Sequence, residues 1–213
     1  MKGSVLSFPE RGPWGDARYR GNCSGHVVRE LLEWYRPGLF VDPMEGSGTS
    51  REVAAEFGIQ YVGLDLREGY DLTRESLIER LPAPADLVFV HPPYWTMIPY
   101  SGKVWGDAPD PRDLSHVPTY EDYLRLLGRA LGNAMAAVCS GGHLAILVGD
   151  IRSRGRYYSP QADIVARGES YLGQLEGILI KVQHNTTSEG KRYAGRFVPI
   201  LHEYLIVFRR QQE

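Results

Sequence analysis

The chain of 213 residues is long enough to bury a full core, and we expect a single domain over residues 1–213. Its two cysteines, Cys23 and Cys139, exclude a disulfide framework and favour a reducing, cytoplasmic compartment. No run reaches about 18 apolar residues, so no membrane partner is expected. The formal net charge is −2, but residues 151–213 hold ten lysines and arginines against six acids, so this basic part could face phosphate.

The first predicted elements are a helix over residues 24–35 and a strand over residues 39–41. Val27, Leu31 and Trp34 recur at helical spacing in the first segment. The second is a short apolar run that ends at an aspartate, and it leads into the first candidate site.

A glycine-rich turn follows that strand, with the sequence Asp-Pro-Met-Glu-Gly-Ser-Gly-Thr from Asp42 to Thr49. Gly46 and Gly48 let the backbone approach a ligand closely, although a tight turn alone could also require them. A helix is predicted to begin with a capping box at Thr49 and to end at Gly58. The order of strand, glycine-rich turn and helix is typical of nucleotide-cradling folds, and the missing Gly-Lys-Ser/Thr run excludes a Walker phosphate loop.

Acidic residues after the next strand suit a nucleoside. The strand predicted at residues 59–64 ends at Asp65, which lies 17 residues after Gly48, near the spacing of roughly 20 at which an acid receives ribose hydroxyls. Asp71 follows, and its carboxylate could accept a hydrogen bond from an adenine amino group. Because the turn contains no lysine, a ligand with a free ribose fits better than a phosphate-rich one.

Residues 89–95 read Phe-Val-His-Pro-Pro-Tyr-Trp at the end of an apolar strand. Pro92 and Pro93 cannot donate to a strand ladder, so they bend the chain at the carboxyl end of the strand, where ligands bind in open α/β sheets. An ordinary strand stop would explain the prolines alone. With His91 before them and Tyr94 after them, the segment carries an acceptor and a ring that suit a planar amino group.

The second half of the chain predicts further strands and helices with two long connections. Residues 96–118 contain four prolines, and their Tyr100 and Trp105 are either ligand contacts or loop anchors. Helices are predicted from Thr119 and Ser159, and strands over residues 143–148, 177–184 and 202–208, with a turn at residues 140–142. The loop over residues 185–200 is either a solvated hairpin tip or a nucleic-acid contact, because aromatic residues alternate with the basic residues Lys191, Arg192 and Arg196.

These elements predict an α/β fold with a Rossmann-like, doubly wound, mostly parallel sheet and a C-terminal antiparallel hairpin. The two motifs together resemble the DNA amino-methyltransferase family that acts on adenine N6 or cytosine N4. Residues 42–49 are similar to its cofactor motif, Asp-Pro-Phe-x-Gly-Ser-Gly-Thr, and residues 91–94 resemble its catalytic motif, Asp/Asn/Ser-Pro-Pro-Tyr/Phe/Trp. Forty-eight residues separate Asp42 from His91, and residues 19–34 resemble the family's preceding segment, so the resemblance covers nearly the whole chain.

The resemblance implies the class I methyltransferase fold, S-adenosyl-L-methionine as cofactor, and direct methyl transfer to a DNA base that has rotated out of the helix. It implies cofactor contacts at Asp42, Pro43, Glu45, Gly46, Gly48, Thr49, Asp65, Leu66, Asp71 and Leu72, with Asn22 and Ser24 near the methionine carboxylate. It implies a catalytic set of His91, Pro92, Pro93 and Tyr94, in which the first two accept from the amine and the base stacks on the tyrosine. The expected substrate contacts are Trp95, Tyr100, Trp105, Lys191, Arg192 and Arg196, and no metal site is expected.

His91 departs from the family motif, which places Asp, Asn or Ser there. Neutral imidazole can still accept a hydrogen bond, whereas imidazolium cannot. The choice between adenine and cytosine therefore stays open, as do an RNA-base methyltransferase, a protein-glutamine methyltransferase and an inactive partner subunit that binds nucleic acid. Sequence specificity could come from residues 96–118, from residues 185–200 or from a second copy in a homodimer.

Overall fold

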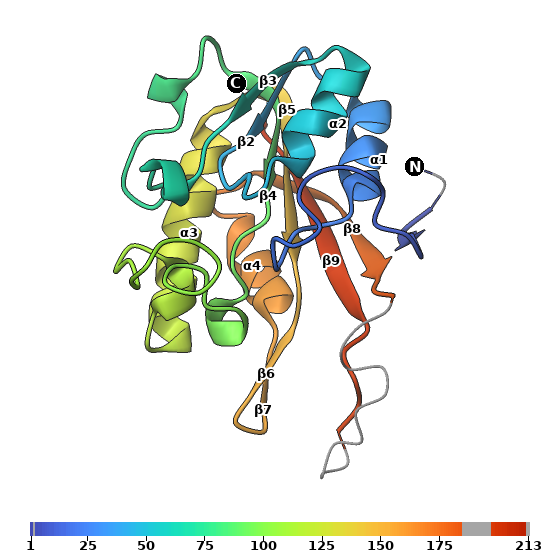
Figure 1. Ribbon diagram of the computed structural model, residues 1–213. Coiled ribbons are helices and arrows are strands. Elements are labelled where there is room, and N and C mark those ends of the chain that lie inside the picture. The colour runs from blue at the N-terminus through green and yellow to red at the C-terminus, as the bar shows by residue number, and fades with distance from the viewer. Residues whose placement is uncertain (2, 185–196, 212–213) are drawn as a thin grey trace.

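The computed structural model describes residues 1, 3–184 and 197–211, so the predicted substrate contacts Lys191, Arg192 and Arg196 lie outside the described residues. Seven strands form one sheet in the order β1-β8-β9-β5-β4-β2-β3, in which β9 alone runs antiparallel to its neighbours (Figure 1). The strands are β1 (Val5–Ser7), β2 (Leu39–Asp42), β3 (Gln60–Gly63), β4 (Ala85–Val90), β5 (Val138–Val148), β8 (Gln174–Val182) and β9 (His202–Arg209). This sheet confirms the predicted α/β class, with β8 and β9 as the C-terminal antiparallel pair.

Helices cover both faces of the sheet (Figure 1). Helices α1 (Gly25–Tyr35) and α2 (Thr49–Phe57) pack on one face, and α3 (Tyr120–Ala136) and α4 (Pro160–Gly168) pack on the other. Side chains alternate between the faces of a strand, so in β4 Leu87 and Phe89 join the first core whereas Val88 and Val90 join the second. The doubly wound arrangement therefore follows from strands that are apolar on both sides.

Local structure differs from the prediction at two turns. The capping box at Thr49 is wrong, because Gly48 is the N-cap in a left-handed conformation (φ 85°) and the Thr49 hydroxyl donates to the Asn22 side chain. The turn expected at residues 140–142 is instead an irregular stretch within β5, where the register with β4 shifts between Ala85 and Leu87 and Gly141 has a φ of 75°. In both places a contact with a distant segment decided the conformation.

Two pieces of strand structure had no counterpart in the prediction. Strand β1 is only three residues long, which is too short for a periodic pattern. Strands β6 (Ile151–Ser153) and β7 (Arg156–Tyr158) form a small antiparallel hairpin, closed by Arg154 and Gly155 with φ values of 49° and 80°. Positive φ at both central residues is the backbone of a tight two-residue hairpin turn, which an arginine does not signal.

The parallel strands β2, β3, β4 and β5 all end at the same edge of the sheet. Asp42 ends β2, and Asp65 and His91 follow β3 and β4, so residues from separate motifs meet there. Residues 96–118 cover this edge as a loop with two short 3-10 helices, η3 (Trp95–Met97) and η4 (Leu114–His116). Within the described ranges, no helix has the length and apolar character that a bilayer crossing needs.

Candidate active site

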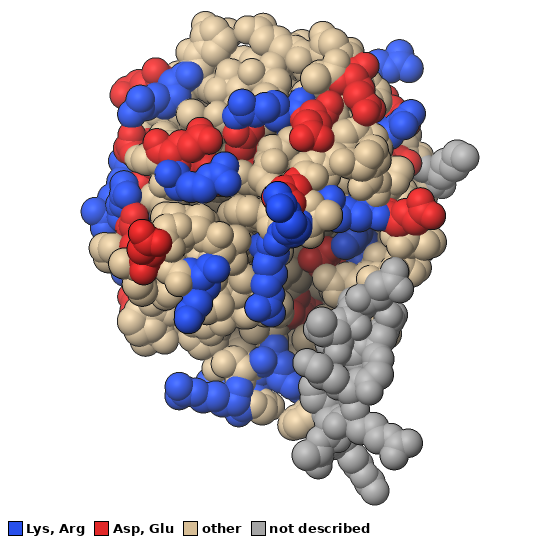
Figure 2. All heavy atoms as spheres, in the orientation of Figure 1, with Lys and Arg blue, Asp and Glu red and all other residues tan. Residues whose placement is uncertain are grey.

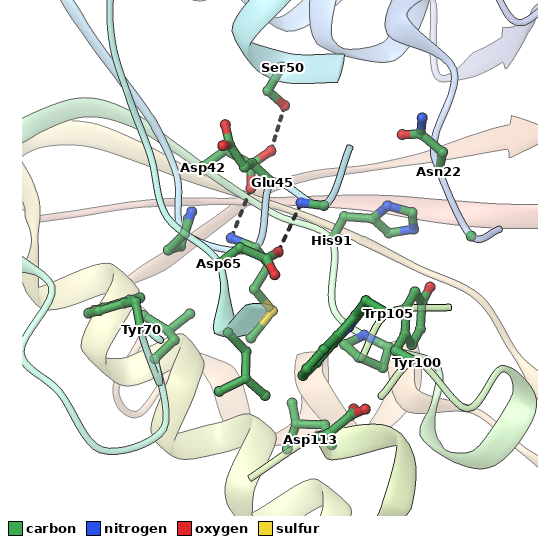
Figure 3. A pocket seen from close by; sticks show the side chains of 18 of the residues that line it. Asn22, Asp42, Glu45, Ser50, Asp65, Tyr70, His91, Tyr100, Trp105 and Asp113 are labelled. Atoms are coloured by element: carbon green, nitrogen blue, oxygen red, sulfur yellow. Dashed lines mark hydrogen bonds between the residues drawn. The ribbon is translucent and has the colours of Figure 1, made fainter. Parts of the chain in front are cut away.

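A cleft opens at this edge and holds about 830 Å³ of empty space, part of it open to solvent (Figure 3). The glycine-rich turn lines one side, and His91, Tyr100 and Trp105 lie together on another (Figure 3). The predicted site residues that line the cleft are Asn22, Asp42, Pro43, Glu45, Gly46, Thr49, Asp65, Leu66, Asp71, Leu72, His91, Pro93, Tyr100 and Trp105.

Five predicted site residues within the described ranges do not line the cleft, namely Ser24, Gly48, Pro92, Tyr94 and Trp95. The Ser24 hydroxyl points away and donates to the Arg11 carbonyl at 3.1 Å. Trp95 is buried, and its indole N–H donates to the Val117 carbonyl at 2.8 Å, so it anchors the loop instead of walling the cleft. A Cβ at Gly48 would meet no protein atom within 4 Å, but the residue has the left-handed backbone conformation that favours glycine.

Asp42 is a buried carboxylate without a basic neighbour. Its Oδ2 accepts from the Ser50 hydroxyl at 2.5 Å and its Oδ1 from the Met44 amide at 3.1 Å. Burial raises the pKa of Asp42 to about 7, and no basic side chain of the described residues contributes to lowering it. A cationic ligand in the cleft would stabilise the ionised form.

Asp65 joins the end of β3 to the glycine-rich turn. Its Oδ2 accepts from the Gly46 amide and its Oδ1 from the Arg67 amide, both at 2.9 Å. Burial raises the pKa of Asp65, and the two amide hydrogen bonds oppose that rise. Each carboxylate oxygen can accept a second hydrogen bond, so Asp65 can also receive two hydroxyl groups from the cleft.

The two carboxylate oxygens of Asp71 have different surroundings. Its Oδ1 accepts from the Thr73 amide at 2.9 Å and from the Thr73 hydroxyl at 2.6 Å. Its Oδ2 is buried and has no hydrogen-bond partner among the described residues, although the Arg74 guanidinium lies 3.3 Å away. A buried acceptor without a donor is unfavourable unless a ligand supplies one.

Asn22 and Glu45 hold the glycine-rich turn in place. The Asn22 side-chain amide donates to the Ser47 hydroxyl at 2.5 Å, and its carbonyl accepts from Thr49 at 2.6 Å. The Glu45 carboxylate pairs with Arg51 and accepts from the Tyr61 hydroxyl at 2.7 Å. Both residues line the cleft, but the turn occupies the polar groups of Asn22, and side chains of α2 and β3 occupy those of Glu45.

His91 lies at the start of a buried polar chain. Its Nε2 is 3.0 Å from the Tyr94 hydroxyl oxygen, and that hydroxyl donates to Glu203 Oε1 at 2.8 Å. Glu203 Oε2 accepts from Lys181 Nζ at 2.7 Å. Burial lowers the pKa of His91 to about 4, so the imidazole is neutral at neutral pH. Tyr94 is tied to this chain and its ring lies against Gly149, which differs from the open stacking shelf that the motif predicts.

The loop over residues 96–118 is held over the cleft by Asp113, which sequence reasoning missed. This buried carboxylate accepts from the Ser101 amide at 2.8 Å, the Ser101 hydroxyl at 2.7 Å and the Ser115 amide at 2.8 Å. The Ser115 hydroxyl in turn accepts from the Tyr100 amide at 2.9 Å. An aspartate two residues before a serine was the available signal, since it is typical of local turns that aspartate side chains cap.

Lys181 and Glu203 were also missed, although each is a charged residue within an apolar strand. They face each other in the register of β8 and β9, and both are nearly buried. Charged residues are almost never fully buried unless they are paired, so this pattern could have marked them as partners.

No family model and no curated protein sequence matches the chain. Among solved structures, a SAM-dependent methyltransferase from Archaeoglobus fulgidus is 13% identical, covers 91% of this chain and 97% of its own, and has a TM-score of 0.50. A Lactococcus lactis protein provisionally described as a hemolysin is 12% identical, with coverages of 93% and 91% and a TM-score of 0.53. The likeness to the Archaeoglobus fulgidus protein confirms the class I methyltransferase fold.

A Thermus thermophilus protein provisionally described as a DNA modification methylase was solved in complex with S-adenosyl-L-methionine. It is 26% identical over 67% of this chain, with a TM-score of 0.45. The matched region is 54% of that protein, so this chain spans about half of its length.

Proposed function

We propose that this protein is an S-adenosyl-L-methionine-dependent methyltransferase that acts on the exocyclic amino group of a DNA base, adenine N6 or cytosine N4. The observation that carries the proposal is that the glycine-rich turn lines one cleft with His91 and Pro93 of the His-Pro-Pro motif, which are far from it in the chain. The fold shared with the Archaeoglobus fulgidus methyltransferase supports the reaction class.

The residues of the cleft fit a cationic nucleoside cofactor. Asp42 is a buried carboxylate that a positive charge would stabilise, Asp65 can accept from the two ribose hydroxyls, and Asp71 lines the same cleft on the side proposed for the adenine. When bound, the cofactor supplies an electrophilic methyl group. The protein contributes acceptors that fix the two ends of the nucleoside, which leaves the target side of the cleft free for the base.

On the target side, His91 accepts a hydrogen bond from the amine and thereby orients the nitrogen lone pair. This role requires neutral imidazole, and the burial that lowers the pKa of His91 to about 4 keeps it neutral. The rings of Tyr100 and Trp105 line the cleft beside His91 and take the stacking role that Tyr94 does not fill (Figure 3). Positioning and electrostatics then account for the catalysis.

The hairpin of β6 and β7 supports a nucleic-acid substrate. It carries Arg152, Arg154 and Arg156, none of which pairs with an acid among the described residues. Arg152 lies over the Tyr157 ring at 5.3 Å, and basic side chains gather at the end of the molecule where this hairpin lies (Figure 2). Basic residues interleaved with aromatic ones suit a nucleic-acid backbone and its exposed bases.

The proposal is tested by incubating the protein with isotopically labelled S-adenosyl-L-methionine and, separately, duplex DNA, total RNA and a protein extract. Nucleoside mass spectrometry should find labelled N6-methyladenine or N4-methylcytosine in the DNA. Label confined to RNA or to protein would contradict the substrate class. If calorimetry detects no cofactor binding, the whole proposal is wrong.

A further inference from the structure

A chain of hydrogen bonds runs through the interior from β8 to the catalytic motif. Lys181 on β8 donates to Glu203 on β9, the Tyr94 hydroxyl donates to Glu203, and the Tyr94 oxygen lies 3.0 Å from His91 Nε2. Only His91 of these four residues lines the cleft. Lys181, Glu203 and Tyr94 can therefore affect the cleft only through His91.

Each hydrogen bond between Lys181 and His91 has a defined donor and a defined acceptor. An ammonium group only donates and an ionised carboxylate only accepts. The single proton of the Tyr94 hydroxyl is committed to Glu203, so its oxygen must accept from Nε2 of His91. A neutral imidazole with a proton on Nε2 has its lone pair on Nδ1.

The free nitrogen is available to a ligand. Nδ1 of His91 has no hydrogen-bond partner among the described residues, and it is not one of the buried atoms without a partner. Because His91 lines the cleft, this lone pair can be reached by a molecule bound there.

We propose that Tyr94, Glu203 and Lys181 are positioning residues that fix the tautomer of His91, so that Nδ1 is the acceptor for the target amine. The identity of the amine rests on the proposed function, whereas the tautomer does not. A histidine can thus replace the Asp, Asn or Ser of the related motif, because the buried chain removes the ambiguity about which nitrogen accepts.

The charge on Glu203 decides which groups donate and which accept in these hydrogen bonds. A protonated Glu203 could donate to the Tyr94 oxygen, the tyrosine could donate to Nε2, and the one imidazole proton would then sit on Nδ1. That proton would face the N–H of the amine, so the site would lose its acceptor. Protonation of a residue two hydrogen bonds away would therefore stop methyl transfer.

Lys181 prevents this reversal. Burial alone would raise the pKa of Glu203, but the Lys181 ammonium and the hydrogen bond from the Tyr94 hydroxyl hold it below its ordinary value. Among the described residues, the titratable groups around Glu203 are Lys181 on β8, His91 and Tyr94 after β4, Cys23 before α1 and Tyr100 in the loop. Lys181 is the one cation among them, so its removal should raise the pKa of Glu203.

Nitrogen-15 NMR of histidine-labelled protein tests the tautomer directly, because protonated and unprotonated ring nitrogens resonate far apart. Wild-type His91 should carry its proton on Nε2. Tyr94→Phe should give a mixture of both tautomers and slow methyl transfer by about tenfold at unchanged cofactor affinity. The matched control is Tyr120→Phe, which removes a hydroxyl that is bonded to Asp163 and takes no part in the hydrogen bonds from Lys181 to His91. The His91 tautomer and the rate of methyl transfer should be unchanged in this variant.

Lys181→Met gives a second readout that a purely structural role would not produce. The acid limb of its single-turnover pH profile should move toward neutral pH by about one unit or more relative to wild type. A wild-type proton on Nδ1, an unaltered tautomer in Tyr94→Phe or an unmoved acid limb in Lys181→Met would each overturn the proposal. If the His91 tautomer changes as expected in Tyr94→Phe but the protein methylates no DNA, the positioning role of these residues is supported and the proposed function is contradicted.

Discussion

The wall of the cleft that carries Asp42 is built from residues close together in the chain, whereas the wall that carries His91 draws on distant ones. Asp42 and its donor Ser50 are eight positions apart, but Tyr94 and its acceptor Glu203 are 109 positions apart. The Asp42 wall combines a strand end, a turn and a helix start with Asn22 and Asp65, whose bonds to the turn span at most 27 positions. The distant wall needs the order of strands in the sheet, since β9 must lie beside β5 and β8 beside β9. The following predictions test whether the two walls have separate tasks.

The largest effect is expected at His91. His91→Ala removes the acceptor for the amine and should lower the single-turnover rate by about 100-fold or more, as loss of one aligned catalytic hydrogen bond does. Cofactor affinity should not change, because Asp42, Asp65 and Asp71 are untouched. His91→Asn should retain part of the rate through its side-chain oxygen. Wild-type turnover from the Ala variant would remove His91 from the mechanism.

The pH dependence of the methyl-transfer rate also tests the role of His91. The active imidazole is neutral, and burial holds its pKa at about 4, so the wild-type rate should stay level as pH falls from 8 to about 5 and drop only below that. In His91→Asn the part of that drop due to imidazole protonation should be absent. An acid limb near pH 6.5 would mean that His91 is exposed to solvent in the working enzyme.

The opposite wall should control affinity. Asp65→Ala and Asp71→Ala each remove an acceptor for the nucleoside and should weaken S-adenosyl-L-methionine binding by about 10-fold to 100-fold in calorimetry. Glu33→Ala, at an exposed acid paired with Arg29, is the matched control. Gly48→Val should also weaken binding, because valine does not tolerate the left-handed backbone there. Unchanged affinity in all three variants would remove the cofactor assignment.

A smaller effect is expected at the loop over residues 96–118. Asp113→Ala deletes three hydrogen bonds that hold Ser101 and Ser115, so Tyr100 and Trp105 should lose their fixed positions. We expect kcat/KM for DNA to fall by about tenfold and amide hydrogen exchange to rise within this loop. Exchange that stays slow would show that Asp113 does not anchor the loop.

The smallest effect concerns the surface. Arg154→Glu at the tip of the hairpin should weaken DNA binding and lower its log–log salt slope by about 0.9 for each lost phosphate contact, with cofactor affinity unchanged. Arg167→Glu, on α4, is the matched charge reversal. The sequence makes the same prediction for Lys191, Arg192 and Arg196, which lie outside the described residues. Equal slopes for Arg154→Glu and Arg167→Glu would place the nucleic-acid surface elsewhere.

Much of the Asp42 wall could be read from the sequence. Apolar runs predicted β2, β3 and β4, and polar residues directly after them had to meet because parallel strands end at one edge. The prediction failed at Thr49, whose hydroxyl is taken by Asn22 from another segment, so the local capping rule lost to a tertiary contact. The prediction that Tyr94 forms a stacking surface failed for the same reason, because the Tyr94 hydroxyl is bonded to Glu203 from β9.

The sequence by itself determined the α/β class, the strand ends and the residues that can accept hydrogen bonds from a nucleoside, because strand periodicity, turn chemistry and side-chain chemistry are local properties. Only the tertiary structure decided that β9 inserts antiparallel between β5 and β8, and so placed Glu203 and Lys181 behind His91. Strand order depends on which long loops close and which apolar faces become buried, and no local pattern encodes that choice.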